Sequence, residues 1–353
     1  MSSSNKVFSS VNSHDALNVV NDAQKADFDK MVAISGGALV EQRQTAYLTR
    51  WQEALVYIPR GARLLDIGGG WPIERIWRAV VEEREVRYHL LDIETALVEA
   101  AQEWLPRYGL PASNAAVGPN THFPFSSGGF DVVFSSHCLE HSPDLAQTFN
   151  EISRVLTPEG LLFFAVPFGF DDSDEHLLYL DIEDWLNATE MAGFEVINYH
   201  VGQVYPMSGW DLCVIARRAP ALANEEGLQN LVKRQSKMQK VLARPADPIF
   251  SYAGPIVRKS DHHILQGQGT SVTVVADKLE ALLFRRHAWS GIVQVTAGKD
   301  ASSGKIIDLY SRIPTIGAVD VRGLSGPVTV TVIGRDRGHS EQAVLHGALL
   351  EAP

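Results

Sequence analysis

Short, almost wholly apolar runs alternate with amphipathic stretches through residues 60–218. Runs of this length and composition are typical of strands that crossover helices bury on both faces. Between them, apolar positions at helical spacing predict helices over 73–84, 94–106, 144–156 and 181–192. The alternation predicts a doubly wound α/β sheet. The apolar runs are ARLLDIG, VRYHLLDI, FDVVFSS, GLLFFAVP, GFEVINYH and WDLCVIARR.

Three further regions surround this α/β segment. Residues 1–59 open with a polar stretch, and near-helical apolar spacing over 38–57 then predicts an N-terminal helical cap. Residues 219–248 are polar and helical in character before a series of prolines, which predicts a helical linker. From 249 to 353, β-prone runs separated by Gly, Ser, Asp or Pro turns predict a separate all-β sandwich, similar to a jelly roll.

Length and composition narrow the class of protein. A chain of 353 residues is long enough for two hydrophobic cores. No apolar run is long enough to cross a bilayer and no apolar leader opens the sequence, so we expect a cytoplasmic protein without a transmembrane segment. Cys138 and Cys213 fall in apolar, strand-like surroundings, where buried thiols are the ordinary interpretation.

The formal net charge of -11 is unevenly distributed. Residues 1–218 hold 15 Lys and Arg against 30 Asp and Glu, whereas residues 219–353 hold 16 against 12. An acidic first part repels polyanions, and it contains no strong basic patch. We therefore expect no nucleic-acid partner.

A glycine turn follows the first apolar run of the α/β segment. Gly68 to Gly70 let the backbone turn sharply and approach a ligand, because a Cβ atom there would block contact. Pro72 and its neighbours leave no third glycine, which disfavours a dinucleotide cofactor. Asp92 ends the second strand, 26 residues after Asp66, where a carboxylate can accept hydrogen bonds from ribose hydroxyls. A helix N-cap is the alternative role of Asp92, and bracing of the glycine turn is that of Asp66.

The order of several segments resembles the class I S-adenosylmethionine-dependent methyltransferases, whose sheet is Rossmann-like. The similarity covers about 64–218 and rests on LLDIGGG, LLDIE, FPFSSGGFDVVFSSHCLEHSPD, EISRVLTPEGLLFFAVP and MAGFEV. The resemblance implies S-adenosyl-L-methionine as the cofactor. It places Gly68 and Gly70 beside the methionine part, Asp92 at the ribose, and the segment 118–121, which includes Asn120, beside the adenine.

Two positions depart from the family's pattern. Pro72 stands where the family commonly has a third glycine, and Asn120 or its neighbour stands where an aspartate commonly meets the adenine amino group. The amide oxygen of Asn120 can accept that hydrogen bond. The predicted cofactor-binding residues also include Asp66 and Ser135.

Three histidines are candidates for the catalytic group. A histidine titrates near neutrality and suits removal of a proton from an acceptor hydroxyl. His137 and His141 follow the third apolar run, and His176 lies on the loop after the next one. The resemblance favours His176 as the base or acceptor contact, whereas packing on the cofactor or helix capping is the alternative for His141. The acidic run 171–175 is typical of solvated surface, so we expect no metal site.

Four polar or aromatic residues of the all-β region are candidates for a second binding surface. Arg285, Arg286, His287 and Trp289 gather at a predicted strand end, where cations and a ring can bind a glycan or phosphate. A polar strand end with one buried tryptophan is the alternative.

The leading hypothesis is O-methylation of a sugar in a glycan or polysaccharide, with the β module positioning the acceptor. A homo-oligomer interface is the module's alternative role. The rival hypotheses are a small-molecule O- or N-methyltransferase of secondary metabolism and a non-catalytic cofactor-binding scaffold protein.

Overall fold

The computed structural model describes residues 6–7, 49–69, 82, 84–205, 209–298, 300–338 and 340–352. Most of the predicted N-terminal cap and of the predicted helix after the glycine turn therefore lie outside the described residues. The chain divides into two compact units. The α/β unit comprises Val11–Phe168 and Ser173–Ser236, and the β unit comprises Met1–Ser10, Gly169–Asp172 and Lys237–Pro353.

In the described part of the α/β unit, seven strands form one sheet in the order β4-β3-β2-β5-β6-β8-β7. Neighbouring strands are parallel except around β8, which runs antiparallel to both β6 and β7. The strands are β2 (Arg63–Ile67), β3 (Arg87–Asp92), β4 (Ala115–Val117), β5 (Phe130–Ser136), β6 (Leu156–Pro167), β7 (Phe194–Tyr205) and β8 (Gly209–Arg218). This sheet confirms the predicted doubly wound α/β class.

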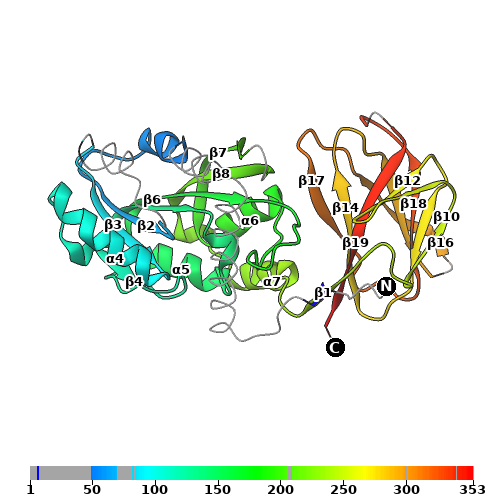
Figure 1. Ribbon diagram of the computed structural model, residues 1–353, viewed down its shortest axis with the longest axis horizontal. Coiled ribbons are helices and arrows are strands. Elements are labelled where there is room, and N and C mark those ends of the chain that lie inside the picture. The colour runs from blue at the N-terminus through cyan, green and yellow to red at the C-terminus, as the bar shows by residue number, and fades with distance from the viewer. Residues whose placement is uncertain are drawn as a thin grey trace. The chain divides into compact units, whose positions relative to one another are not determined.

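Hydrophobic cores form on both faces of this sheet, because successive side chains of each strand point to opposite faces. On β2, Leu65 and Ile67 enter one core while Leu64 enters the other. Helices α5, α6 and α7 contribute to the first core, and α4 and the helical residues 49–55 contribute to the second (Figure 1). The helices are α4 (Thr95–Trp104), α5 (Leu145–Val155), α6 (Ile182–Met191) and α7 (Glu225–Gln235).

The strand order reverses between β2 and β5, which pair with each other at the centre of the sheet. Ile67 at the end of β2 is level with Leu91 of β3 on one side and with Ser135 of β5 on the other. The carboxyl ends of these three strands therefore meet at one edge. In open α/β sheets, ligands bind in the crevice outside such a reversal point.

The β unit consists of two antiparallel sheets, which Figure 1 shows in yellow to red except for the short N-terminal strand β1 (Lys6–Val7) in blue. Alternating apolar positions of both sheets share one core, as with Val272 and Val330 of one sheet and Leu282 and Leu345 of the other. This arrangement confirms the predicted all-β second region.

The first sheet of the β unit holds β1 (Lys6–Val7), β9 (Lys240–Ala243), β11 (Ile256–Arg258), β12 (His263–Gln266), β14 (Leu279–Arg286), β17 (Thr315–Asp320) and β19 (Gln342–Glu351). The second sheet holds β10 (Phe250–Ala253), β13 (Ser271–Val274), β15 (Ile292–Ala297), β16 (Asp300–Asp308) and β18 (Val328–Gly334).

The predicted linker, residues 219–248, contributes elements to both units. Helix α7 belongs to the α/β unit, where Leu228 and Leu231 enter the core beside α5 and α6. Strand β9 belongs to the β unit, where it pairs with β19 and β1. Among the described helices, none has the length and apolar character that a membrane span requires.

Candidate functional site

The glycine turn directly after β2 forms a close-fitting cradle. Gly68 has a φ of 66°, and a Cβ atom there would lie 2.7 Å from Cβ of Cys138. A Cβ atom on Gly69 would overlap the side chain of Leu90. Only glycine meets both demands, a left-handed backbone and close approach of neighbouring groups. Gly70, the other predicted turn residue, lies outside the described residues.

Two buried aspartates flank this turn. Asp66 accepts a hydrogen bond of 2.6 Å from the hydroxyl of Tyr88, and a Cβ atom on Gly69 would lie 2.7 Å from its Oδ2. This contact favours the bracing role of Asp66. Asp92 ends β3 and is 7% exposed, and its Oδ1 accepts a 2.9 Å hydrogen bond from the Glu94 amide. Glu94, not Asp92, is the N-cap of α4. The predicted N-cap role of Asp92 is thus not the one observed, and its ribose role stays a prediction.

The segment predicted at the adenine lies beside Asp92. The Gly118 amide donates a 3.0 Å hydrogen bond to the Asp92 carbonyl, which fixes the start of the segment. Asn120 is 9% exposed, and its Nδ2 donates a 3.4 Å hydrogen bond to the Cys138 carbonyl. Its Oδ1 is buried without a hydrogen-bond partner among the described residues, as is Oγ of Ser135. A buried acceptor of this kind fits an amino group such as that of adenine.

Past β5, the chain makes a 3-10 turn, η4 (Leu139–His141), that carries two polar side chains, Glu140 and His141. Two residues before the turn, His137 has a left-handed backbone with a φ of 53°, and its amide donates a 2.8 Å hydrogen bond to the Ala165 carbonyl. Such strained residues concentrate at functional sites. Nδ1 of His137 lies 3.2 Å from Oε1 of Glu140, and Nε2 of His141 lies 3.8 Å from the same oxygen.

The loop after β6 brings the third predicted histidine to this turn. The Leu177 amide donates a 2.9 Å hydrogen bond to the Glu140 carbonyl, and Nδ1 of His141 donates one of 2.6 Å to the Glu175 carbonyl. The rings of His176 and His141 consequently lie with their centroids 5.1 Å apart. The structure thus brings His137, His141 and His176 to one place, with Glu140 among them.

A buried network of charged side chains contacts this group through His137. Arg50 is 1% exposed, and it donates a 2.9 Å hydrogen bond to Oγ of Ser136 and forms an ion pair with Asp211. Nε2 of His137 lies 3.1 Å from Oδ2 of Asp211. His137 therefore has a carboxylate beside each ring nitrogen, Asp211 at Nε2 and Glu140 at Nδ1.

The charges of this network shift the pKa values of its members. Burial and Arg50 lower the pKa of His137, but Asp211 and Glu140 together raise it above the ordinary value. Burial raises the pKa of Asp211, but His137 and Arg50 outweigh it and lower the pKa to about 2. For His141, burial lowers the pKa more than Glu140 raises it. The surroundings thus shift the pKa values of these two histidines in opposite directions.

The sequence did not single out three of the residues that build this group. Arg50 and Asp211 are 161 positions apart, and only the folded sheet joins them. Glu140 lies between two predicted histidines, so its position next to them was a signal that we did not use. The predicted catalytic and cofactor-binding roles of the individual residues stay predictions.

Comparison with known protein families identifies the domain that contains this site. Residues 65–164 match a family model described as a methyltransferase domain. They form a class I S-adenosylmethionine-dependent methyltransferase domain. This assignment confirms the family and the cofactor, S-adenosyl-L-methionine, that the sequence predicted, and the turn, Asp92 and Asn120 fit a nucleoside of this kind.

The methyltransferase domain also resembles individual proteins. Over 142 residues, the chain is 31% identical to an uncharacterized methyltransferase of Mycobacterium sp. (strain JLS), covering 38% of this chain and 52% of that protein. It is 31% identical over 104 residues to the C-methyltransferase NovU of Streptomyces niveus, covering 27% and 24%. The chain thus spans about half the length, or less, of these curated relatives.

A solved structure similar to the methyltransferase domain is the Burkholderia thailandensis 1,6-didemethyltoxoflavin-N1-methyltransferase, with bound 1,6-didemethyltoxoflavin and S-adenosylhomocysteine. Its TM-score is 0.45 at 20% sequence identity, and the match covers 59% of this chain and 91% of that one.

Proposed function

We propose that the protein transfers a methyl group from S-adenosylmethionine to a hydroxyl of a sugar or similar polyhydroxylated acceptor. The observation that carries this proposal is the placement of two groups at one edge of the sheet. The glycine turn with Asp92 forms a cradle for a nucleoside cofactor, and a buried carboxylate with two histidines lies at the ends of the next strands.

The cofactor half of the proposal assigns one role to each described group. Asp92 holds the ribose hydroxyls through its carboxylate, and Oδ1 of Asn120 accepts a hydrogen bond from the adenine amino group. Gly68 and Gly69 admit the methionine part, since side chains there would collide with their surroundings. When bound, the cofactor supplies an activated methyl group on a sulfonium.

The acceptor half must place an oxygen in line with that methyl group. In the transfer, the acceptor oxygen forms a bond to the methyl carbon while the carbon–sulfur bond breaks, and its electron pair returns to sulfur. The O–H bond also breaks, so a polar group must make the hydroxyl easier to deprotonate. His141 and His176 are the described groups that we assign to contact with this hydroxyl. His137 is a positioning residue in this proposal, because both its ring nitrogens already face carboxylates.

We also assign a glycan-binding surface to the β unit. Trp289 is 58% exposed, and its amide donates a 3.2 Å hydrogen bond to Nδ1 of His287. An exposed aromatic ring near cationic side chains can stack on a sugar ring. We assign Trp289, with the neighbouring Arg285 and Arg286, to this contact.

A second candidate is methylation of a small molecule on carbon or nitrogen. The curated relatives favour it, because they include a protein named as a C-methyltransferase and one named as a phosphoethanolamine N-methyltransferase. This candidate predicts transfer to compounds without a sugar and no effect of Trp289→Ala.

Binding of S-adenosylhomocysteine, measured by calorimetry, tests the cofactor half. Asp92→Ala removes a charged hydrogen-bond acceptor, which costs about 1.5–3 kcal/mol, so affinity falls by about 10- to 150-fold. Asp131→Ala is the matched control, because its carboxylate accepts a 2.9 Å hydrogen bond from the Arg63 amide at the start of the strands. Unchanged affinity in Asp92→Ala would contradict the assignment.

Transfer of a labelled methyl group tests the acceptor. Purified protein is incubated with the labelled cofactor and with sugar nucleotides, oligosaccharides, phenols and small amines. We expect label on a sugar oxygen, and loss of that label in His176→Ala. Transfer to phenols or amines alone would replace the sugar proposal with the second candidate.

A further inference from the structure

Glu140, His141 and His176 form a compact group of potential metal ligands, here called the Glu-His-His cluster. One ligand atom of each residue lies within 4.8 Å of the other two, and His141 Nε2 is 3.8 Å from Glu140 Oε1. Two atoms that each bind one ion at about 2.1 Å can be at most about 4.2 Å apart. Small side-chain rotations therefore bring the cluster to metal-binding distances.

The hydrogen bond of His141 orients its ring for such a role. A backbone carbonyl can only accept, so the 2.6 Å contact between Nδ1 and the Glu175 carbonyl places the proton on Nδ1. The lone pair of Nε2 then points away from that carbonyl and lies on the side of Glu140. Metal-binding histidines are oriented in this way, with the second ring nitrogen donating to a carbonyl or carboxylate.

The carboxylate of Glu140 has one oxygen that its described neighbours do not use. Glu140 is 1% exposed, and its ion pairs with His137 and His141 both involve Oε1. Within the described ranges, no residue donates a hydrogen bond to Oε2. A carboxylate oxygen buried in this way requires a cation or a donor.

From this geometry we propose that Glu140, His141 and His176 bind one divalent first-row transition-metal ion, such as zinc or cobalt. Two imidazoles and one carboxylate suit these ions, and three protein ligands leave further positions for a substrate oxygen. The metal assignment depends only on these three side chains. It replaces, as a proposal, the expectation from the sequence that the protein has no metal site.

A metal here would refine the role of the histidines in the acceptor half. This assignment rests on the proposed function. We assign the metal's open coordination position to the acceptor hydroxyl, whose pKa falls on coordination. The hydroxyl proton then passes to solvent, and the oxygen forms its bond to the methyl carbon as the carbon–sulfur bond breaks. His141 and His176 act as ligands in this arrangement, not as bases.

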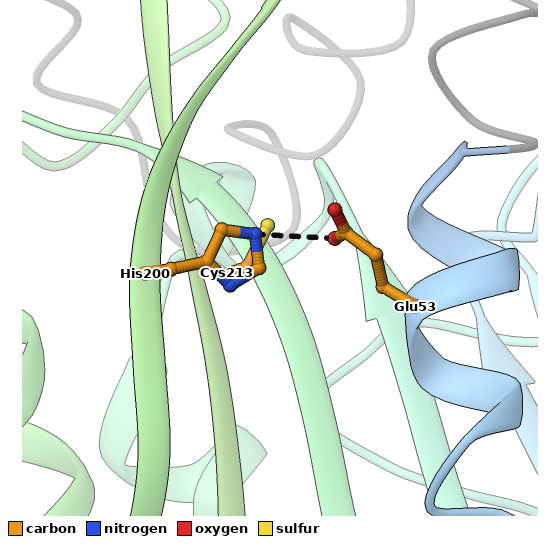
Figure 2. A group of neighbouring side chains, drawn as sticks. All are labelled: Glu53, His200 and Cys213. Atoms are coloured by element: carbon orange, nitrogen blue, oxygen red, sulfur yellow. Dashed lines mark ion pairs between the residues drawn. The ribbon is translucent and has the colours of Figure 1, made fainter.

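A second group of potential ligands, Glu53, His200 and Cys213, lies on helix 49–55, β7 and β8 (Figure 2). Nε2 of His200 is 3.2 Å from Oε2 of Glu53, and both side chains are more than one-third exposed. Burial raises the pKa of the Cys213 thiol to about 12, which disfavours the thiolate that a metal requires. This group carries no proposal and supplies matched control variants.

Metal binding to tag-free, chelator-treated protein tests the proposal without cofactor or acceptor. Calorimetric titration with zinc, and the visible absorption of added cobalt, report stoichiometry and ligand field. We expect one ion per chain, and affinity lower by about 100-fold or more in Glu140→Gln, His141→Ala and His176→Ala. His200→Gln and Cys213→Ser are expected to bind as the unmodified chain does.

Several outcomes separate the possible failures. Circular dichroism and S-adenosylhomocysteine binding show whether each variant is folded, and His176→Ala, on a loop, is the least disruptive change. If the folded chain binds neither metal, or if His176→Ala and His141→Ala bind it fully, the metal proposal is wrong. Metal binding without transfer to any acceptor would instead overturn only the proposed function.

Discussion

Replacing Asp211 by asparagine removes the central charge of the buried network while keeping the shape of the side chain. Asp211 is 3% exposed, and it forms an ion pair with Arg50 and lies 3.1 Å from Nε2 of His137. The variant leaves a guanidinium, itself 1% exposed, without its carboxylate. A buried charge that loses its partner is strongly destabilising, because it was removed from water without compensation.

The expected loss of stability follows from two quantities, the pKa shift of Asp211 and the usual cost of breaking a buried ion pair. The pKa of Asp211 falls from 3.8 to about 2 in the folded protein, which corresponds to about 2 kcal/mol in favour of the charged form. Breaking a buried pair costs about 3–5 kcal/mol, since it includes the cost of the uncompensated partner. We therefore expect Asp211→Asn to lower the free energy of unfolding of the α/β unit by about 3 kcal/mol.

Urea unfolding at neutral pH, followed by tryptophan fluorescence, measures this loss. Trp51 and Trp185 are fully buried in the α/β unit and report its unfolding. With a slope of about 3 kcal/mol per molar urea, the midpoint falls by about 1 M. Glu85→Gln is the control, since its ion pair with Arg60 is exposed and its loss should leave the midpoint unchanged.

A double variant distinguishes charge from packing. Arg50→Met combined with Asp211→Leu removes both charges and keeps apolar volume, so we expect it to recover at least half of the stability lost in Asp211→Asn. The reasoning is refuted if Asp211→Asn moves the midpoint no further than Glu85→Gln. It is also refuted if the double variant loses as much as the two single changes together.

Three other predictions concern the cradle, the adenine contact and the β unit. Gly68→Ala should weaken S-adenosylhomocysteine binding at least about tenfold, since it combines a left-handed backbone with a clash at Cys138. Gly109→Ala, with a φ of 73° and open space, should leave binding unchanged in the same titration. Asn120→Leu should also weaken binding about tenfold whereas Asn120→Asp retains it, and equal affinities would disprove the adenine contact. Burial lowers the pKa of His346 from 6.5 to about 4, so its neutral form favours folding. The unfolded β unit then binds more protons as the pH falls from 6.5 to 4, and its stability should decrease by about 2 kcal/mol across this window. His346→Gln should flatten that decrease in calorimetric scans, and an unchanged pH profile would contradict the assignment.

The sequence predicted the strands that are buried on both faces and missed the short ones. The apolar runs at β2, β3, β5, β6, β7 and β8 all form strands of the one sheet, and its inner strands contribute to the cores on both faces. The three-residue β4 (Ala115–Val117) is too short to show a period. In the β unit, the sequence also missed β10, β11 and β12, since strands of three or four residues at Gly and Pro turns resemble loops.

The two halves of the site differ in how directly the sequence encodes them. The proposed cofactor half follows from local order, because Gly68 directly follows β2 and Asp92 ends β3, and the apolar run of each strand predicts it. The acceptor half depends on contacts between distant segments. Arg50 reaches Asp211 only because β8 runs antiparallel beside β6, and this reversal has no local sequence signal.

The loop of His176 connects the acceptor half to the β unit through the chain itself. The four residues Gly169–Asp172 directly precede this loop and belong to the β unit, where the Phe170 amide donates a 2.7 Å hydrogen bond to the Ile316 carbonyl. Lys237, 1% exposed, pairs with Asp171 in the same unit. One end of the His176 loop is thus tied to the β unit, while its other end is tied to Glu140 by the Leu177 amide. A change that weakens the first tie should therefore alter acceptor turnover and leave S-adenosylhomocysteine affinity intact, because the cradle at Gly68 shares neither hydrogen bond.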